Sequence, residues 1–188
     1  LQAIAGSKKF IVTCYNKMGI AAVNAKDYEN AIANFTEAAN YAELYEDIAN
    51  MNKNRTYIGQ VYEVQGGDAF NAGDYATAIT VFSKGYEADP RNTSMALYLA
   101  ESYFRSDMYS EGMGICSAIM ALNPEKYAEA QSEAQSKIDM YTNNQVAKLQ
   151  MANDYDGIIA MAEQLDDAAI AQKITMQAYY GKKDYNKM

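Results

Sequence analysis

The same short turn, followed by a tyrosine, recurs along this chain of 188 residues. In most copies the turn ends in Asp, and the stretch after the tyrosine can form a helix. The marker tyrosines are Tyr28, Tyr75, Tyr109, Tyr155 and Tyr185. Asp is a favoured residue just before a helix, where its side chain caps free backbone N–H groups. Repetition of one unit predicts an array of similar elements stacked on one another.

Each marker tyrosine lies between two stretches with apolar residues at helical spacing. In the first copy, Tyr15 and Met18 precede Tyr28, and Ile32 and Phe35 follow it. Proline, which helix interiors exclude, closes the second stretch in two later copies. The unit is therefore helix–turn–helix, and the 34 residues from the second to the third marker tyrosine give its length.

These units resemble the tetratricopeptide repeat family, whose pattern is aromatic-x2-Leu-Gly-x2-Tyr, then Ala-x3-Phe and a closing Pro. The second copy reads Tyr62-x2-Gln65-Gly66-x2-Ala69, then Ala78-x3-Phe82 and Pro90. The first and third copies follow it closely, the fourth is degenerate, and the fifth is half a repeat. The resemblance implies an all-α fold, a right-handed α-α superhelix or solenoid.

We expect one array over residues 1–188, with units at about 12–58, 59–92, 93–138 and 139–168 and a partial unit at 169–188. Two spacings between marker tyrosines, 47 and 46 residues, exceed the repeat length. Glu43–Met51 and Glu125–Met140 have helix-forming compositions, so we expect some elongated helices rather than long loops.

The last spacing, from Tyr155 to Tyr185, is only 30 residues. Either the turn near residues 164–169 is short, or residues are missing there. Because the last unit is half a repeat, we also expect the chain to be part of a longer array, since the end of a solenoid needs a polar cap.

Composition excludes several kinds of chemistry. The chain has no His, two Cys, 16 Lys and Arg, and 24 Asp and Glu, which give a net charge of -8. Catalysis by His, a His-ligated metal and a four-thiolate zinc site are thereby excluded, and the acidic balance disfavours nucleic acid as a partner. We expect no catalytic residues, no metal and no cofactor.

The residues that could carry other chemistry have simpler explanations. Cys116 takes the place of Phe35 and Phe82 in the sister repeats, so we interpret it, like Cys14, as a packing residue. The acidic pairs Glu46/Asp47 and Asp166/Asp167 do not have the spacing of a calcium loop, and we interpret them as solvated.

In the resembled family, the first helices of the repeats line a concave groove that takes a peptide or a partner helix. Carried onto this sequence, the groove would present Asn16, Ile20, Asn24, Glu63, Phe70, Asn71, Leu97, Glu101, Phe104, Arg105, Asn143, Gln150 and Met151, with Val23 on the same face. Ile20, Glu63, Gly67, Leu97 and Glu101 break the carboxylate-clamp pattern of the chaperone-binding branch. The mixed Asn, aromatic and acidic character suits a peptide with basic and apolar side chains.

We therefore predict a non-enzymatic scaffold that binds a protein or peptide in this groove. One alternative is a structural or regulatory arm of a larger enzyme or envelope assembly. Another is a glycan- or small-molecule-binding protein, disfavoured by the absence of Trp although the 17 Tyr could substitute. No apolar run approaches the length of a membrane span. The missing initiator Met and the Asn- and Tyr-rich, Lys-poor surface favour an extracytoplasmic bacterial location, such as the periplasm.

Overall fold

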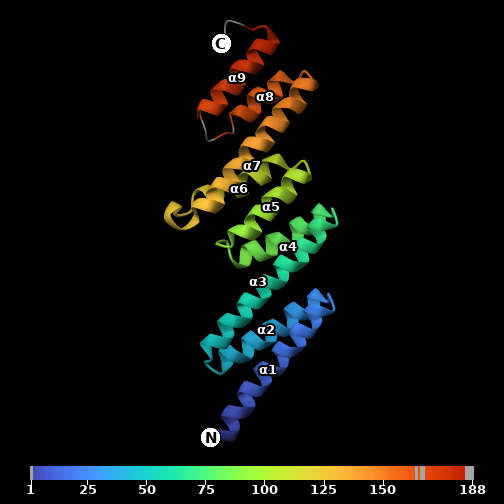
Figure 1. The fold of residues 1–188 in the computed structure, drawn as a ribbon, viewed down its shortest axis with the longest axis vertical. Helices are drawn as coiled ribbons and strands as arrows, with labels where there is room; N and C mark the ends of the chain where they lie inside the picture. Colours follow the sequence, from blue (N-terminus) through green and yellow to red (C-terminus); the bar gives the residue numbers. More distant parts are fainter. Residues whose placement is uncertain (1, 164, 166–167, 185–188) are drawn as a thin grey trace. The chain divides into compact units, whose positions relative to one another are not determined.

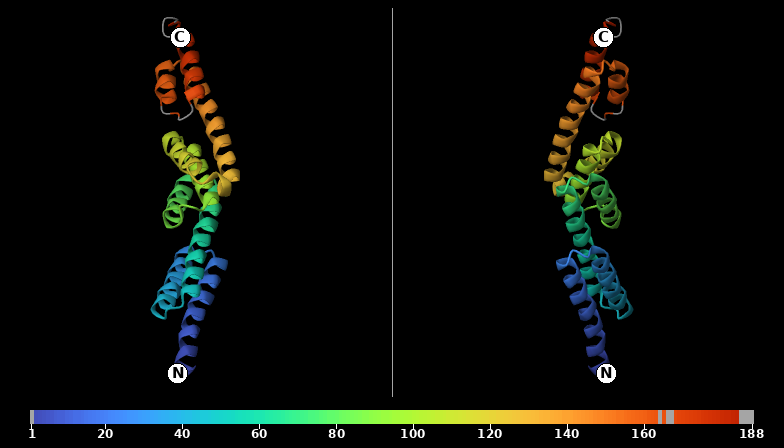
Figure 2. Two further views of the ribbon diagram at one scale, coloured as in Figure 1. Left: turned by 90° about the vertical axis from the view of Figure 1, so that its left-hand side faces the viewer. Right: turned by 90° about the vertical axis from the view of Figure 1, so that its right-hand side faces the viewer.

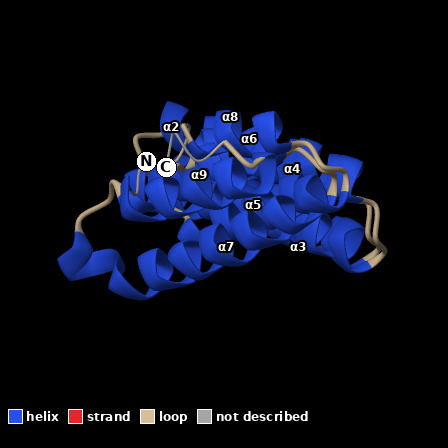
Figure 3. Ribbon diagram, turned by 90° about the horizontal axis from the view of Figure 1, so that it is seen from above, coloured by secondary structure: helices blue, strands red, loops and turns tan. Residues whose placement is uncertain are grey.

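The computed structural model describes residues 2–163, 165 and 168–184, with side chains from Phe10 onward except that of Ala169 (Figure 1). Within these residues the chain forms nine helices and no strand (Figure 3). The helices are α1 Gln2–Asn24, α2 Tyr28–Leu44, α3 Ile48–Asn71, α4 Tyr75–Ala88, α5 Thr93–Arg105, α6 Tyr109–Met120, α7 Pro124–Met151, α8 Tyr155–Ala162 and α9 Ala168–Lys182. The predicted all-α fold is confirmed, and so are the elongated helices, of which α3 has 24 residues and α7 has 28.

The chain divides into two compact units, Leu1–Ala134 and Gln135–Met188, and the boundary falls within α7. Tyr127, near the start of α7, has a non-helical backbone (φ -122°, ψ 20°) and marks a kink.

In the first unit, consecutive helices from α1 to α6 pack against one another as neighbours. In addition, α1 contacts α3, and α3 contacts α5. The first helices of successive pairs therefore share one layer, while α2, α4 and α6 cover its other side (Figure 2). The N-terminal part of α1 extends beyond α2 (Figure 1).

The recurring turn is a helix C-cap joined directly to the next N-cap. In the first turn Lys26 adopts a left-handed backbone (φ 57°). The Lys26 N–H donates to the Val23 carbonyl (2.9 Å) and the Asp27 N–H donates to the Ala22 carbonyl (2.9 Å), the two bonds of a Schellman motif. Asp27 then accepts from the Asn30 N–H and caps α2.

The same geometry recurs at five further turns. Their left-handed residues are Glu46, Gly73, Asp107, Asn153 and Lys183. The next residue caps the following helix through its side chain at Asp47, Asp74 and Asp154, whereas Met108, at the start of α6, makes no side-chain cap bond. The recurring motif thus ends one helix and begins the next within five residues.

The helix-forming segment Glu43–Met51 is not a single helix. α2 ends at Leu44, a turn follows, and α3 begins at Ile48. The turn has a left-handed residue, Glu46, followed by an Asp cap, Asp47, as the turns before α2 and α4 do, but Ile48 replaces the marker tyrosine. The 13 extra residues therefore lengthen α2 and α3 on either side of this turn, compared with α4 and α5.

The core of the first unit places a phenylalanine of a second helix against a glycine of a first helix. A Cβ added to Gly19 would lie 2.6 Å from the Phe35 ring, and one added to Gly66 would lie 2.5 Å from the Phe82 ring. Only a residue without a side chain permits this close approach. Cys116, at the equivalent place in α6, is fully buried.

The second unit consists of the C-terminal part of α7 with α8 and α9. α8 and α9 pack against each other, and four apolar side chains of these helices are buried: Ile158, Met161, Ile174 and Ala178. The Lys182 ammonium donates to Asp156 Oδ1 (2.5 Å). The fifth marker, Tyr185, lies outside the described residues, as does most of the predicted irregularity near residues 164–169. None of the helices in the described part of the chain combines the length and hydropathy that a membrane span needs.

Candidate functional site

The predicted groove residues differ widely in exposure. Ile20, Asn24, Asn71, Arg105, Asn143, Gln150 and Met151 are exposed. Asn16, Glu63 and Phe70 are half-buried, and the side-chain oxygen of Asn16 is buried without a hydrogen-bond partner among the described residues.

Leu97, Glu101 and Phe104 are buried, with exposed fractions of 7%, 8% and 7%. Their helix, α5, has 13 residues and packs against α4, α6 and α3, so little of its surface is left open. Glu101 accepts a hydrogen bond from Arg105 Nε (2.9 Å) one turn along the same helix. Phe104 packs against Gly112, where an added Cβ would lie 2.7 Å from its ring.

A hollow of about 240 Å³ lies where α1 and α3 meet over α2. Its walls combine six apolar side chains with two carboxamides: Ile20, Val23 and Asn24 of α1, Phe35 of α2, and Tyr57, Gln60, Val61 and Val64 of α3. Residues three and four apart share one face of a helix, which explains why these positions converge. Ile20 and Val64 are both about half exposed (48% and 47%), so the hollow opens to solvent.

The equivalent place between α3 and α5 is filled. Tyr98 stacks on Phe82 with ring centroids 5.7 Å apart, and Phe70 meets Tyr98 edge-on at 5.5 Å. Tyr98 follows Val64 by 34 residues, the repeat length, and Phe70 occupies the position of Val23 in the first copy. The α1–α3 junction therefore keeps a hollow because Val64 and Val23 stand where the α3–α5 junction has Tyr98 and Phe70.

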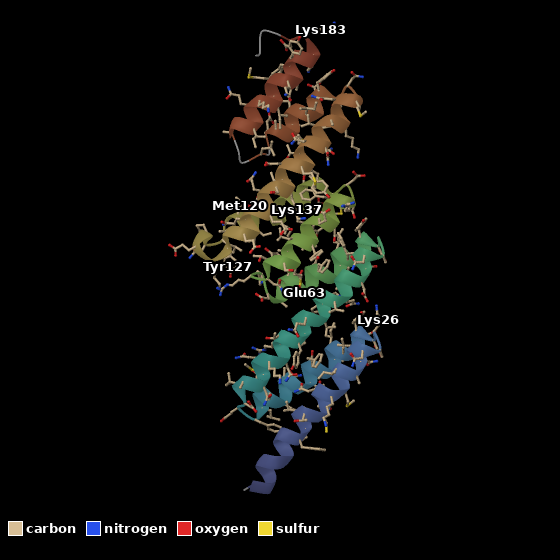
Figure 4. The ribbon with its side chains drawn as sticks, viewed as in Figure 1. Lys26, Glu63, Met120, Tyr127, Lys137 and Lys183 are labelled. Carbon is tan, nitrogen blue, oxygen red and sulfur yellow. The ribbon has the colours of Figure 1, made fainter. Side chains whose placement is uncertain are left out.

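A polar cluster fastens the α1–α2 turn to α3 beside the hollow. The Lys26 ammonium and the Tyr28 hydroxyl each donate to Asp68 Oδ2 at 2.6 Å. These two hydrogen bonds hold the pKa of the Asp68 carboxyl below its usual range. Burial and the hydrogen bond to Asp68 raise the pKa of Tyr28. Figure 4 labels Lys26 at the end of α1 and Glu63 on α3.

A second, more polar hollow of about 550 Å³ adjoins the other side of α3. Gln60 borders both hollows. Glu63 borders the polar one and accepts a hydrogen bond from the Ser94 hydroxyl of α5 (3.3 Å). Of the predicted site residues, Ile20, Asn24 and Glu63 thus border hollows of the first unit.

The second unit has a larger hollow, of about 840 Å³, against the exposed face of α9. Its lining combines amides, aromatic rings and one cation, from Gln150, Tyr155, Gln172, Lys173, Met176, Gln177, Tyr180 and Gly181. Gln150 is the one predicted site residue that it contains. Tyr180 is 64% exposed and presents its ring to solvent.

Sequence reasoning placed Ile20, Val23 and Asn24 on this face but missed Val64, Tyr57 and the other residues that close the hollow from α2 and α3. A signal was present in the sequence. Aligning the copies by their period sets Val64 against Tyr98, and this large difference in side-chain volume marks a place where one junction has space.

Residues 69–138 match a family model described as tetratricopeptide repeat. This segment runs from the end of α3 through α4, α5 and α6 into α7. Among curated proteins, none matches the sequence. The paired helices and this match support the assignment of the chain to the tetratricopeptide repeat family.

Proposed function

We propose that this chain is a scaffold that binds a protein or peptide through the face formed by α1 and α3. Tetratricopeptide repeats generally mediate protein–protein interactions and are typically not catalytic. Of the predicted groove residues, Ile20 and Asn24 of α1 border the hollow that supports this use, whereas Leu97, Glu101 and Phe104 of α5 are buried.

The observation that carries the proposal is the open hollow with Ile20 and Val64 at its mouth. Exposed apolar side chains around a concavity, with polar groups at the rim, are the arrangement that binding sites use. Asn24 and Gln60 supply those polar groups, since each carboxamide can both donate to and accept from a peptide backbone.

The test begins with a peptide selected against the full chain from a random library displayed on phage. Ile20→Glu places a charge at the mouth of the hollow and is expected to weaken binding of that peptide at least about tenfold, since contacts at an interface centre dominate affinity. Leu44→Glu, at an exposed apolar residue outside the hollow, is the matched control and should leave the affinity within about twofold. Equal losses in both variants, or none in either, would contradict the proposal.

A second candidate function, binding of a glycan or small molecule, is favoured by the hollow against α9. Its volume lies in the range of about 300 to 1,000 Å³ that is usual for ligand sites. Tyr155 and Tyr180 could stack on a sugar ring, and three glutamines could hydrogen-bond its hydroxyls. Screening the chain on a glycan array, with Tyr180→Ala and Gln172→Ala as variants, tests this function. Binding that both variants retain would count against the α9 hollow.

A further inference from the structure

We propose that the hollow between α1 and α3 is an anchor pocket for one aromatic side chain of an extended peptide. This inference rests on the proposed function and adds the residue class that the peptide must present. Three features support it: the size of the hollow, the chemistry of its lining, and the way the same fold fills the neighbouring junction.

The size of the hollow limits its occupant. At about 240 Å³, it falls below the range of about 300 to 1,000 Å³ that is usual for drug-sized ligands and cofactors. A single large side chain is therefore a suitable occupant.

The lining favours an apolar occupant. The eight residues that border the hollow, all in the described part of the chain, include no charged side chain. Two of them are aromatic, and the Phe35 and Tyr57 rings lie 5.0 Å apart at 47°. An aromatic side chain that enters between Ile20 and Val64 meets these rings in the offset or edge-on arrangements that aromatic groups prefer.

The neighbouring junction shows what such an occupant looks like. There the chain's own Tyr98 stacks on Phe82, which is the equivalent of Phe35. At the open junction the equivalent of Tyr98 is Val64, which leaves the space that a ring from a partner can take. The aromatic residue of the peptide thus packs at the α1–α3 junction as the chain's own Tyr98 packs at the α3–α5 junction.

Backbone recognition accompanies the anchor. Asn24 of α1 and Gln60 of α3 lie on the two sides of the hollow, and both are uncharged. Their carboxamides can pair with the N–H and carbonyl groups next to the anchored residue without selecting its neighbours. The expected specificity is therefore for the aromatic residue itself.

The test uses a small probe, N-acetyl-phenylalanine amide, with N-acetyl-alanine amide for comparison. Methyl NMR spectra of the full chain should show saturable shifts of Ile20, Val23 and Val64 with the phenylalanine probe and none with the alanine probe. The tyrosine ring introduced by Val64→Tyr should fill the hollow and abolish these shifts at Ile20 and Val23.

The controls separate occupancy from unfolding. Val64 is about half exposed, so Val64→Tyr should keep the thermal unfolding profile of the wild type. Equal shifts with both probes, no shift with either, or shifts that persist in Val64→Tyr would overturn the inference. A selected peptide that still binds in an Ile20-dependent way under those outcomes would leave the proposed function standing, which distinguishes the two failures.

Discussion

The junctions between α1 and α3 and between α3 and α5 have the same construction but different contents. In both, a phenylalanine of the second helix packs on a glycine of the first, Phe35 on Gly19 and Phe82 on Gly66. Only the second junction adds Tyr98, which stacks on its phenylalanine. The repeat thus supplies a common frame, and the side chains at the Val64/Tyr98 and Val23/Phe70 positions decide whether a junction is filled or keeps a hollow.

The largest effect is expected where an added methyl group has no room to be accommodated. Gly66→Ala should lower the free energy of unfolding by about 2 to 3 kcal/mol, because Phe82 is fully buried beneath Tyr98. Gly19→Ala should cost only about 1 kcal/mol, since Phe35 borders the hollow and its ring can shift into it. Chemical denaturation of both variants measures the difference.

Gly67→Ala is the matched control for these two variants. A Cβ at Gly67 meets nothing within 4 Å, so alanine should be neutral or stabilise α3 by up to about 1 kcal/mol through its higher helix propensity. If Gly19→Ala proves as costly as Gly66→Ala, the first junction is as tightly packed as the second and the comparison fails.

Exchanging the side chains that differ should have a smaller effect on stability. Tyr98→Val removes a stacked ring and an edge contact and should cost about 1 to 2 kcal/mol. Val64→Tyr should change stability by no more than about 0.5 kcal/mol, since it is a partly exposed position beside open space. Chemical denaturation measures both changes. Equal destabilisation would show that the hollow beside Val64 cannot accommodate a tyrosine ring.

The Asp68 cluster, present at the first junction, should make stability depend on pH. Because the pKa of Asp68 is lowered in the folded chain, its contribution is present above the pKa of an unfolded Asp, about 3.9, and is lost as the pH falls through the folded value. Asp68→Asn should therefore lower Tm at pH 7, by less than Tyr98→Val does.

Thermal unfolding from pH 7 to pH 2 checks the Asp68 prediction: the gap between Asp68→Asn and wild type should close at the acid end. Glu43→Gln provides the control, because the Glu43–Arg55 pair is exposed and 3.7 Å long and should contribute little at any pH. A constant gap across the range would mean that the Asp68 charge is unimportant.

A gain in stability is expected at α6. Its N-cap is Met108, which makes no side-chain cap bond, whereas Asp74 caps α4 by accepting from Thr77. Met108→Asp should supply the missing acceptor and raise the free energy of unfolding by about 0.5 to 1 kcal/mol. Met108→Leu, which changes the side chain without adding an acceptor, should leave stability unchanged in the same denaturation experiment.

The sequence predicted the helical pairs well because their signals are local. The left-handed residue, the Asp cap and the tyrosine occupy three consecutive positions at several turns, so they can be read without tertiary information. The turn before α3 was missed because Ile48 stands in place of the tyrosine, although Glu46 and Asp47 carry the rest of the motif. A search for a residue that can adopt a left-handed backbone followed by an Asp cap, without the tyrosine, identifies that turn as well.

The candidate site was less predictable because exposure depends on neighbouring helices. Ile20 and Leu97 were assigned to one groove by position in the repeat, yet Ile20 is half exposed and Leu97 is buried. α5 is short and is flanked by α4 and α6. The position of Leu97 within its repeat carries no information about these neighbouring helices. The hollow itself depends on Val64, which becomes informative only when set beside Tyr98.

The most direct measurement is the affinity of a library-selected peptide for the wild type and for Val64→Tyr, by isothermal titration calorimetry. Filling the hollow from within should weaken binding at least about tenfold, because a buried aromatic anchor dominates an interface. Tyr98→Val, which leaves the α1–α3 hollow intact, should bind as the wild type does. Unchanged affinity in Val64→Tyr would contradict the account and place the binding surface elsewhere on the chain.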